Sequence, residues 1–177
     1  MKKILLKRLN ILRLLKIYKI LMVISMSKDW TIDTIVLYKA ANTDTDACYF
    51  LLNIIEKGDG VVFDFEGRIV QEYNNCLRKI QNERKGSCEL VQKWFKHVVA
   101  KLAKKCSGKL QQRHKTKFIE LNFDSSDWPF VAVCSKTISK KLVSEDSDYT
   151  IDVKNYLLKE MKVSVLSVHN CLNRRML

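Results

Sequence analysis

Short apolar runs alternate along this chain with longer segments of helical periodicity. The run Trp30–Leu37 is β-branched or aromatic on both sides of Asp33 and predicts a buried strand. Similar short runs predict strands at residues 61–64, 141–144 and 163–166. Because helical patterns separate these runs, we expect a three-layer α/β/α fold, with helices on both faces of a central parallel sheet of four or five strands.

Apolar residues at helical spacing predict the elements that join these strands. Capping side chains at residues 43–46 begin the first helix, and a glycine ends it. An apolar stripe with lysines on the other faces predicts a long helix over residues 88–106. The expected helices contain residues 47–55, 69–80, 88–106, 130–134 and 150–161. We expect a short extended piece at residues 118–121 and surface positions for His97 and His114.

The length of 177 residues fits one domain, residues 26–177, preceded by an extension, residues 1–25. The extension carries seven basic residues and no acidic residue. Since basic residues interrupt each of its apolar runs, it predicts neither a signal peptide nor a stable membrane span. Two interpretations remain: a basic helical extension, or sequence upstream of a start at Met26.

Cysteine usage and charge restrict the setting and the partners. The six cysteines never form a C-x-x-C pair, which predicts reduced thiols in a cytoplasmic protein, and the three histidines show no zinc-ligand spacing with them. The formal net charge of +13 favours a polyanionic partner. The basic segment from Lys93 to Lys117 is either a solvated face or an RNA-binding surface. The candidate RNA-binding residues are Lys101, Lys104, Lys105, Lys109, Arg113 and Lys115.

Acidic residues stand at corresponding ends of the predicted elements. Asp33 lies at the end of the first strand, and Asp146 ends the third; Glu72 and Asp127 lie on helices that could reach the same edge. Each has a plainer interpretation, as a helix cap or a surface residue. Together, clustered carboxylates repel one another unless a hard cation neutralises them. Oxygen ligands without His or Cys suit Mg²⁺ or Mn²⁺.

Four segments carry a resemblance to a known family. Residues 32–37 (IDTIVL) resemble D-T-N/S-V-L, and residues 67–73 (GRIVQEY) resemble the segment with that family's second acid. Residues 127–134 (DWPFVAVC) resemble D-x-x-F-L-A-V-A, and residues 142–149 (LVSEDSDY) resemble L-V-T-x-D-x-D-F. From about Trp30 to the C-terminus the chain therefore resembles a PIN domain, the metal-dependent nuclease fold of many toxin–antitoxin ribonucleases.

The resemblance implies four acids around a Mg²⁺ or Mn²⁺ ion and two acids in support, to which we add two hydroxyls that orient the ligands. The four acids are Asp33, Glu72, Asp127 and Asp146; the supporting acids are Asp124 and Asp148; the hydroxyls belong to Thr34 and Ser144. One position departs from the family pattern. Ile35 stands where the family has Asn or Ser, whose side chain helps to place the metal or its water.

The function expected on this basis is metal-dependent cleavage of single-stranded or looped RNA by the toxin of a toxin–antitoxin pair. Besides RNA, the partners to consider are an antitoxin protein and a second copy of the chain. One alternative is a structure-specific DNA nuclease, because related folds use similar acidic groups. The other is a PIN-like scaffold that binds RNA or a protein without cutting, and Ile35 is its best support.

Overall fold

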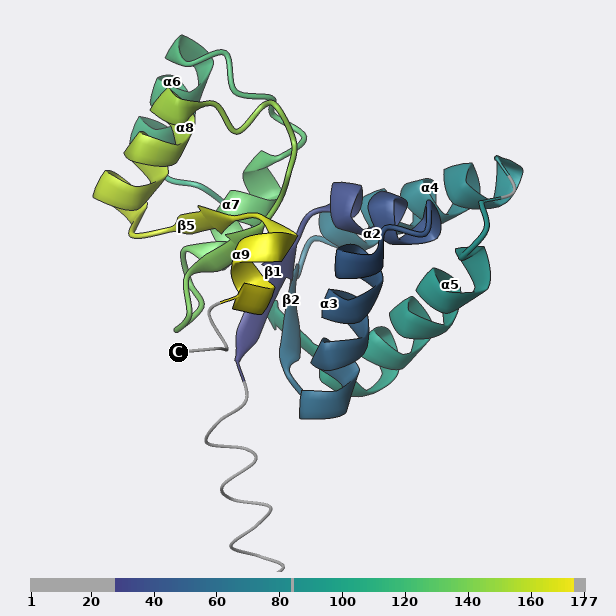
Figure 1. Cartoon of the computed structure of the whole chain (residues 1–177). Helices are drawn as coiled ribbons and strands as arrows, with labels where there is room; N and C mark the ends of the chain where they lie inside the picture. The colour runs from purple at the N-terminus through teal and green to yellow at the C-terminus, as the bar shows by residue number, and fades with distance from the viewer. Residues whose placement is uncertain (1–27, 84, 174–177) are drawn as a thin grey trace, which may run out of the picture.

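The fold is built around a five-stranded, all-parallel sheet with the strand order β3-β2-β1-β4-β5. The structure is a computed structural model that describes residues 28–83 and 85–173 (Figure 1). The predicted extension, residues 1–25, lies outside the described residues. The strands are β1 (Asp29–Ile32), β2 (Gly60–Asp64), β3 (Ala103–Cys106), β4 (Lys141–Val143) and β5 (Ser164–Leu166).

Helices cover both faces of this sheet, so the predicted three-layer α/β/α fold is confirmed (Figure 1). On one face lie α2 (Thr34–Ala41), α3 (Thr45–Lys57), α4 (Arg68–Asn82) and α5 (Cys88–His97), with α9 (Val168–Asn173) against α3. On the other face lie α6 (Gln112–Glu120), α7 (Trp128–Cys134) and α8 (Ile151–Tyr156). Two π-helical turns, η1 (Val98–Leu102) and η2 (Leu157–Met161), extend α5 and α8.

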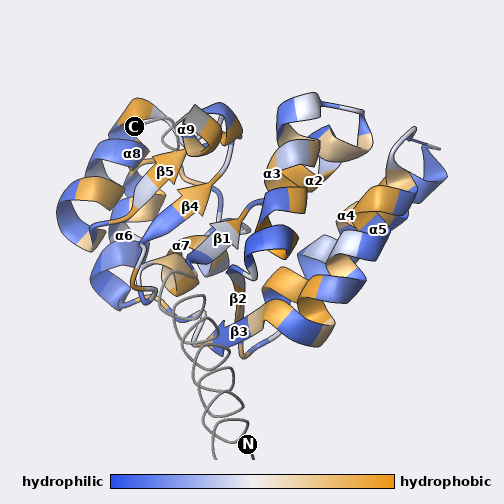
Figure 2. Cartoon of the chain, turned by 60° about the horizontal axis from the view of Figure 1, so that its bottom comes forward, coloured by the Kyte–Doolittle hydropathy of each residue, from blue (hydrophilic) through white to orange (hydrophobic). Residues whose placement is uncertain are grey.

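Strand β1 lies at the centre of the sheet, with a paired strand along each of its edges. Trp30 pairs with Val61 of β2, and Thr31 pairs with Leu142 of β4. Figure 2 shows β2 and β4 in hydrophobic colours, whereas β3 at the edge is largely hydrophilic. The strands differ in hydropathy because an interior parallel strand is buried on both faces, whereas an edge strand such as β3 is partly exposed.

A buried tyrosine links the sheet to the helices of both layers. The Tyr73 hydroxyl donates a hydrogen bond of 2.6 Å to the carbonyl of Ile32, at the last residue of β1. Its ring packs against Phe63 of β2 and Phe95 of α5, and stacks on Phe130 of α7. Helices α4 and α7 are therefore held close to the end of β1, where the candidate site begins.

The first strand is shorter than predicted, and a helix follows it. The run Trp30–Leu37 was expected to be a buried strand with Asp33 at its end; the structure divides the run, because β1 ends at Ile32 and α2 starts at Thr34. Asp33 caps this helix, and the side chains of Val36 and Leu37 within the helix are fully buried. Tertiary burial here outweighs the low helix propensity of β-branched residues, which is a weak term for each residue.

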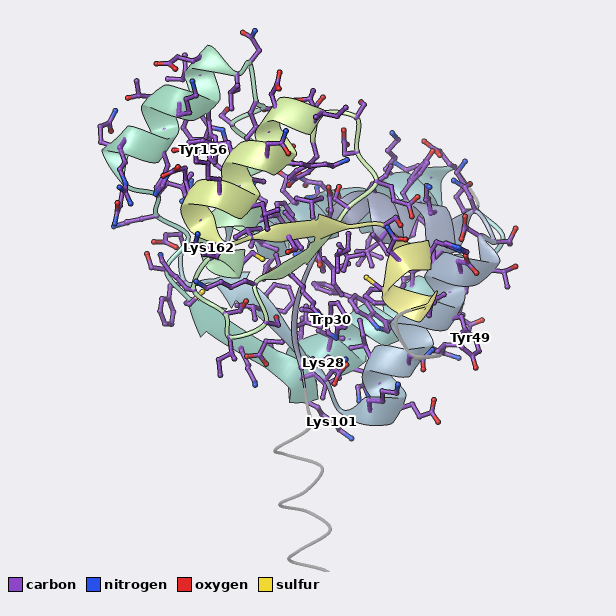
Figure 3. The ribbon with its side chains drawn as sticks, turned by 60° about the vertical axis from the view of Figure 1, so that its left-hand side comes forward. Lys28, Trp30, Tyr49, Lys101, Tyr156 and Lys162 are labelled. Atoms are coloured by element: carbon purple, nitrogen blue, oxygen red, sulfur yellow. The ribbon has the colours of Figure 1, made fainter. Side chains whose placement is uncertain are left out.

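Two other predicted elements in the basic region are wrong. The helix over residues 88–106 ends at His97; after η1 the chain forms β3, which pairs with β2 from Val61–Ala103 to Asp64–Cys106. Residues 118–121, expected to be extended, belong mostly to α6. His114, expected on the surface, is buried in α6, and its Nδ1 lies 2.8 Å from the hydroxyl of Tyr156. Figure 3 shows Tyr156 where α8 faces α6.

Candidate functional site

The candidate site lies at the carboxyl ends of β1 and β4, where the strand order reverses. Along the chain β1 is followed by β2 on one side, and only much later by β4 on the other side. Ligands of open parallel sheets bind in the crevice at such a switch point. Asp33 directly follows β1, and Ser144 directly follows β4. The backbone N–H of Asp33 donates to the carbonyl of Val143 at 2.9 Å, which joins the two strand ends.

Asp33 is almost fully buried and is held by three hydrogen bonds. Its Oδ2 accepts a bond of 2.5 Å from the Ser144 hydroxyl. Its Oδ1 accepts bonds of 3.3 Å from the Ile35 N–H and from the Thr34 hydroxyl. Burial raises the pKa of Asp33, and the bonds from Ser144 and Ile35 oppose that rise. The interpretation of Asp33 as a helix cap is therefore confirmed, since it caps α2 directly after β1, and its role as a metal ligand stays a prediction.

The loop after β4 brings Asp146 to the same place. Ser144 bridges the two acids, because its hydroxyl donates to Asp33 and accepts a 3.0 Å bond from the N–H of Asp146. The Oδ1 of Asp146 accepts a 3.0 Å bond from the N–H of Asp148. Glu145 anchors the loop through an ion pair with Lys39 of α2. The predicted supporting role of Ser144 thus has a geometric basis.

Asp127 joins this pair from the opposite face of the sheet. Helix α7 packs against β1, β2 and β4, and Asp127 occupies its N-cap position without a capping bond from its side chain. Burial, and then the charges of Asp33 and Asp146, raise the pKa of Asp127 to about 8. Asp124 and Asp148 add smaller contributions. We call Asp33, Asp127 and Asp146 the acidic triad.

A tyrosine hydroxyl next to the acidic triad was not singled out from the sequence. Tyr149 is buried, and its hydroxyl has no hydrogen-bond partner among the described residues. Burial, and then the charges of Asp127 and Asp33, raise its pKa. A buried hydroxyl without a partner is uncommon in native proteins. The one sequence signal is that Tyr149 stands where the resembling family pattern has Phe.

The fourth predicted acid, Glu72, approaches from α4. It is half-buried and lines a hollow of about 360 Å³ between α2 and α4. Asp146 lines the same hollow, as do Thr34 and Ile35. Of the four predicted acids, Asp33 and Asp146 both raise the pKa of Asp127. Glu72 is not among the groups that act on Asp127, and it shares only the lining of the hollow with Asp146. Ile35 lies where it was expected to matter, beside the acids and half-buried.

The donors at this site suit a hard cation in kind. Carboxylate and hydroxyl oxygens are the ligands that Mg²⁺ and Mn²⁺ prefer. Within residues 28–83 and 85–173, however, no three side chains of His, Cys, Asp or Glu stand close enough together to hold a metal ion. Mutual repulsion keeps carboxylates apart when no cation lies between them. Binding of an ion would therefore have to draw the acidic triad closer.

The predicted RNA-binding residues lie at opposite edges of the sheet. Lys104 forms an ion pair of 2.5 Å with Asp29 at the start of β1, far from the strand ends that carry the acids. Figure 3 shows Lys101 next to Lys28 at this amino edge. The other four candidates lie within the second half of β3 or after its carboxyl end in the sequence. These are Lys105 within β3, Lys109 in the next loop, and Arg113 and Lys115 in α6.

Comparison with protein-family models, with curated proteins and with solved structures finds no match for this chain. The family resemblance therefore depends on the four quoted segments alone. In the part of the chain that the structure describes, no helix is both long and apolar enough to cross a membrane. All six cysteines lie in this part, and none of them forms a disulfide there.

Proposed function

We propose that this chain is a Mg²⁺- or Mn²⁺-dependent endoribonuclease that cleaves single-stranded or looped RNA, of the PIN-domain type that its sequence resembles. The observation that supports this proposal most is the acidic triad. Three carboxylates from the ends of β1, β4 and α7 meet at the switch point of a parallel sheet, where burial, and then the charges of Asp33 and Asp146, raise the pKa of Asp127 to about 8. Plain helix caps need no such convergence, and Asp127 makes no capping bond.

In this proposal each site residue has a stated part. Asp33, Asp127 and Asp146 would hold the ion, and Glu72 would join them or orient a water. Bound Mg²⁺ or Mn²⁺ supplies positive charge that activates water and stabilises charge on the phosphate oxygens. Ser144 keeps Oδ2 of Asp33 in position through its 2.5 Å bond. The resemblance further implies products with 5′-phosphate and 3′-hydroxyl ends.

The partners belong to the same proposal. A net charge of +13 favours a polyanion such as RNA. From the family resemblance we propose a cytoplasmic toxin, with an antitoxin protein as its partner and a second copy of the chain as a further one. A small reading frame for an antitoxin next to this gene would support that setting.

The proposal is tested by cleavage of a labelled RNA stem-loop in Mg²⁺, in Mn²⁺ and in EDTA. We expect cleavage that EDTA stops and Mn²⁺ restores. Asp33→Asn and Asp146→Asn should each abolish it while the variant retains its circular dichroism spectrum. The matched control is Asp152→Asn, an exposed aspartate in the first turn of α8, which should cleave like the wild type. Full activity in EDTA would contradict the metal mechanism.

A non-catalytic scaffold is the second candidate, and Ile35 is the observation that favours it. An isoleucine beside the acids cannot hydrogen-bond a metal-bound water, and it lines the hollow where such a water would be held. RNA binding without metal-dependent cleavage in any of the buffers would select the scaffold. Equal cleavage of a DNA flap would instead move the substrate class to structured DNA.

A further inference from the structure

The hollow between α2 and α4 has features that the acidic triad does not account for. Its volume of about 360 Å³ falls at the small end of ligand-binding pockets. It has room for one nucleotide and is too small for a duplex. Its lining contains the acids Glu72 and Asp146 and the cation Lys79. Acidic and basic side chains therefore line the same hollow.

Helix α4 arranges its part of the lining along one face. Glu72, Asn75, Cys76 and Lys79 all line the hollow, and their spacing of three or four residues places them on the same side of the helix. From Glu72 to Lys79 the helix rises about 10 Å, at about 1.5 Å per residue. One nucleotide can therefore lie along this face with its phosphate groups directed toward the two ends.

The position of Lys79 is set by an aromatic ring. Its Nζ lies 4.9 Å from the centre of the Tyr38 ring, and Lys85 lies 5.1 Å from the same ring. The Tyr38 hydroxyl donates a 2.5 Å bond to Glu83, which in turn pairs with Lys85 at 3.0 Å. Lys79 forms no ion pair within the described residues. Its charge thus lies at the hollow, where it can meet an anion and also adds a small part to the lowered pKa of Glu83, after the hydrogen bonds from Tyr38 and Lys85.

The wall between the two ends is neutral. Ile35 of α2 and Cys76 of α4 supply apolar atoms, and the Cys76 thiol donates to the carbonyl of Thr34 at 3.7 Å. Burial raises the pKa of Cys76 to about 11, so the thiol is uncharged at neutral pH. Asn75 accepts a bond of 2.8 Å from Arg78 through its Oδ1, which leaves its amide N–H groups as donors.

We infer that this hollow is a subsite for one unpaired nucleotide of single-stranded RNA, next to the phosphate that would be cleaved at the acidic triad. Lys79 binds the flanking phosphate, Asn75 donates to an acceptor on the base, and Ile35 and Cys76 contact the face of the base. This inference rests on the proposed nuclease function. It also gives a physical reason for a preference for single strands or loops, because a paired base cannot enter the hollow.

The test measures binding and cleavage separately on the full chain. The binding probe is a fluorescein-labelled single-stranded octaribonucleotide in EDTA, titrated at several salt concentrations. Lys79→Gln should weaken binding by about 3- to 10-fold and flatten the salt slope by about 0.7, the share of one phosphate contact. Lys79→Arg should retain most of the affinity. The control is Lys57→Gln, an exposed lysine in the last turn of α3 next to the amino end of β2, which should change neither quantity.

The cleavage arm uses a randomised single strand in Mn²⁺ and sequences the ends of the products. Asn75→Ala should change the base preferred at one position beside the cut. Unchanged preference, together with unchanged binding by Lys79→Gln, would overturn the subsite while leaving the nuclease proposal intact. Absence of cleavage in the wild type, with binding still weakened by Lys79→Gln, would overturn the nuclease and support the hollow as a nucleotide site. Equal losses in Lys79→Gln and Lys57→Gln would show binding by diffuse charge and refute the subsite.

Discussion

Replacing Asp127 by Asn should stabilise the metal-free protein, increasingly so as the pH rises. Burial and the other acids raise the pKa of Asp127 to about 8 in the folded chain, from an ordinary value of 3.8. Between these values the folded state keeps a proton that the unfolded state has lost, so the wild type loses stability as the pH rises from about 4 to about 8. Asparagine is neutral throughout and removes that dependence.

The magnitude follows from the size of the pKa difference. About four pH units, at about 1.36 kcal/mol each, set an upper limit of roughly 5 kcal/mol above pH 8. Asp127 is only half-buried, and solvent screening reduces the effect, so we expect a gain of about 1–3 kcal/mol at pH 8.5. Asp33→Asn should give part of this gain, because the charge of Asp33 is the second cause of the raised pKa.

Urea unfolding followed by circular dichroism, in EDTA at pH 4.5, 6.5 and 8.5, measures this difference. The free energy of unfolding of Asp127→Asn minus that of the wild type should grow across the series. Asp152→Asn, on the exposed start of α8, should show no such growth. A difference for Asp127→Asn that stays constant from pH 4.5 to 8.5 would refute a raised pKa and the crowding of the acidic triad.

Three further changes have defined outcomes. Ile35→Asn should raise metal-dependent turnover by up to about 100-fold, because it restores a side chain that can place the metal-bound water; unchanged turnover in a folded variant would refute this. Tyr149→Phe should raise the free energy of unfolding by about 1 kcal/mol, since it removes a buried hydroxyl that has no hydrogen-bond partner within residues 28–83 and 85–173; a lower melting temperature would contradict this. Burial, and then the charge of Arg113, lower the pKa of His114, so wild-type stability should fall below about pH 6.5 as the unfolded chain gains a proton. His114→Phe should lose this dependence in thermal melts, and equal pH profiles would count against it.

Hydrophobic periodicity predicted most of the sheet but not the edge strand β3. The runs at residues 61–64, 141–144 and 163–166 correspond to β2, β4 and β5. Strands β2 and β4 are interior and buried on both faces, and the edge strand β5 carries Val165 and Leu166. The edge strand β3 reads Ala-Lys-Lys-Cys, a sequence with no β-branched residue, and lysines are common on edge strands. Its pattern is equally typical of a helix end, so only pairing with β2 distinguishes the two.

The acids were easier to find than their surroundings. Strand ends can be read from the sequence, and Asp33 and Asp146 follow two of them. Placing Asp127 beside them depended on family resemblance, because it requires α7 to cross the opposite face of the sheet. His114 and Tyr149 could not be predicted as buried, since a helix of mostly polar residues and a loop give no periodic signal.

The strand order also has a consequence for how the protein is made. Asp33 and its partner Ser144 are 111 residues apart, and β1 acquires its second neighbour only with β4. At typical ribosomal rates, roughly 5–20 s separate the synthesis of these two residues. During that interval the nascent chain can pair β1 with β2 and β3, but it has no bond from Ser144 to Asp33 and no Asp146. A chain released early would thus carry three of the five strands, with the edge of β1 that pairs with β4 left open. On the proposed function, it would have no means of cutting the RNA that surrounds it on the ribosome.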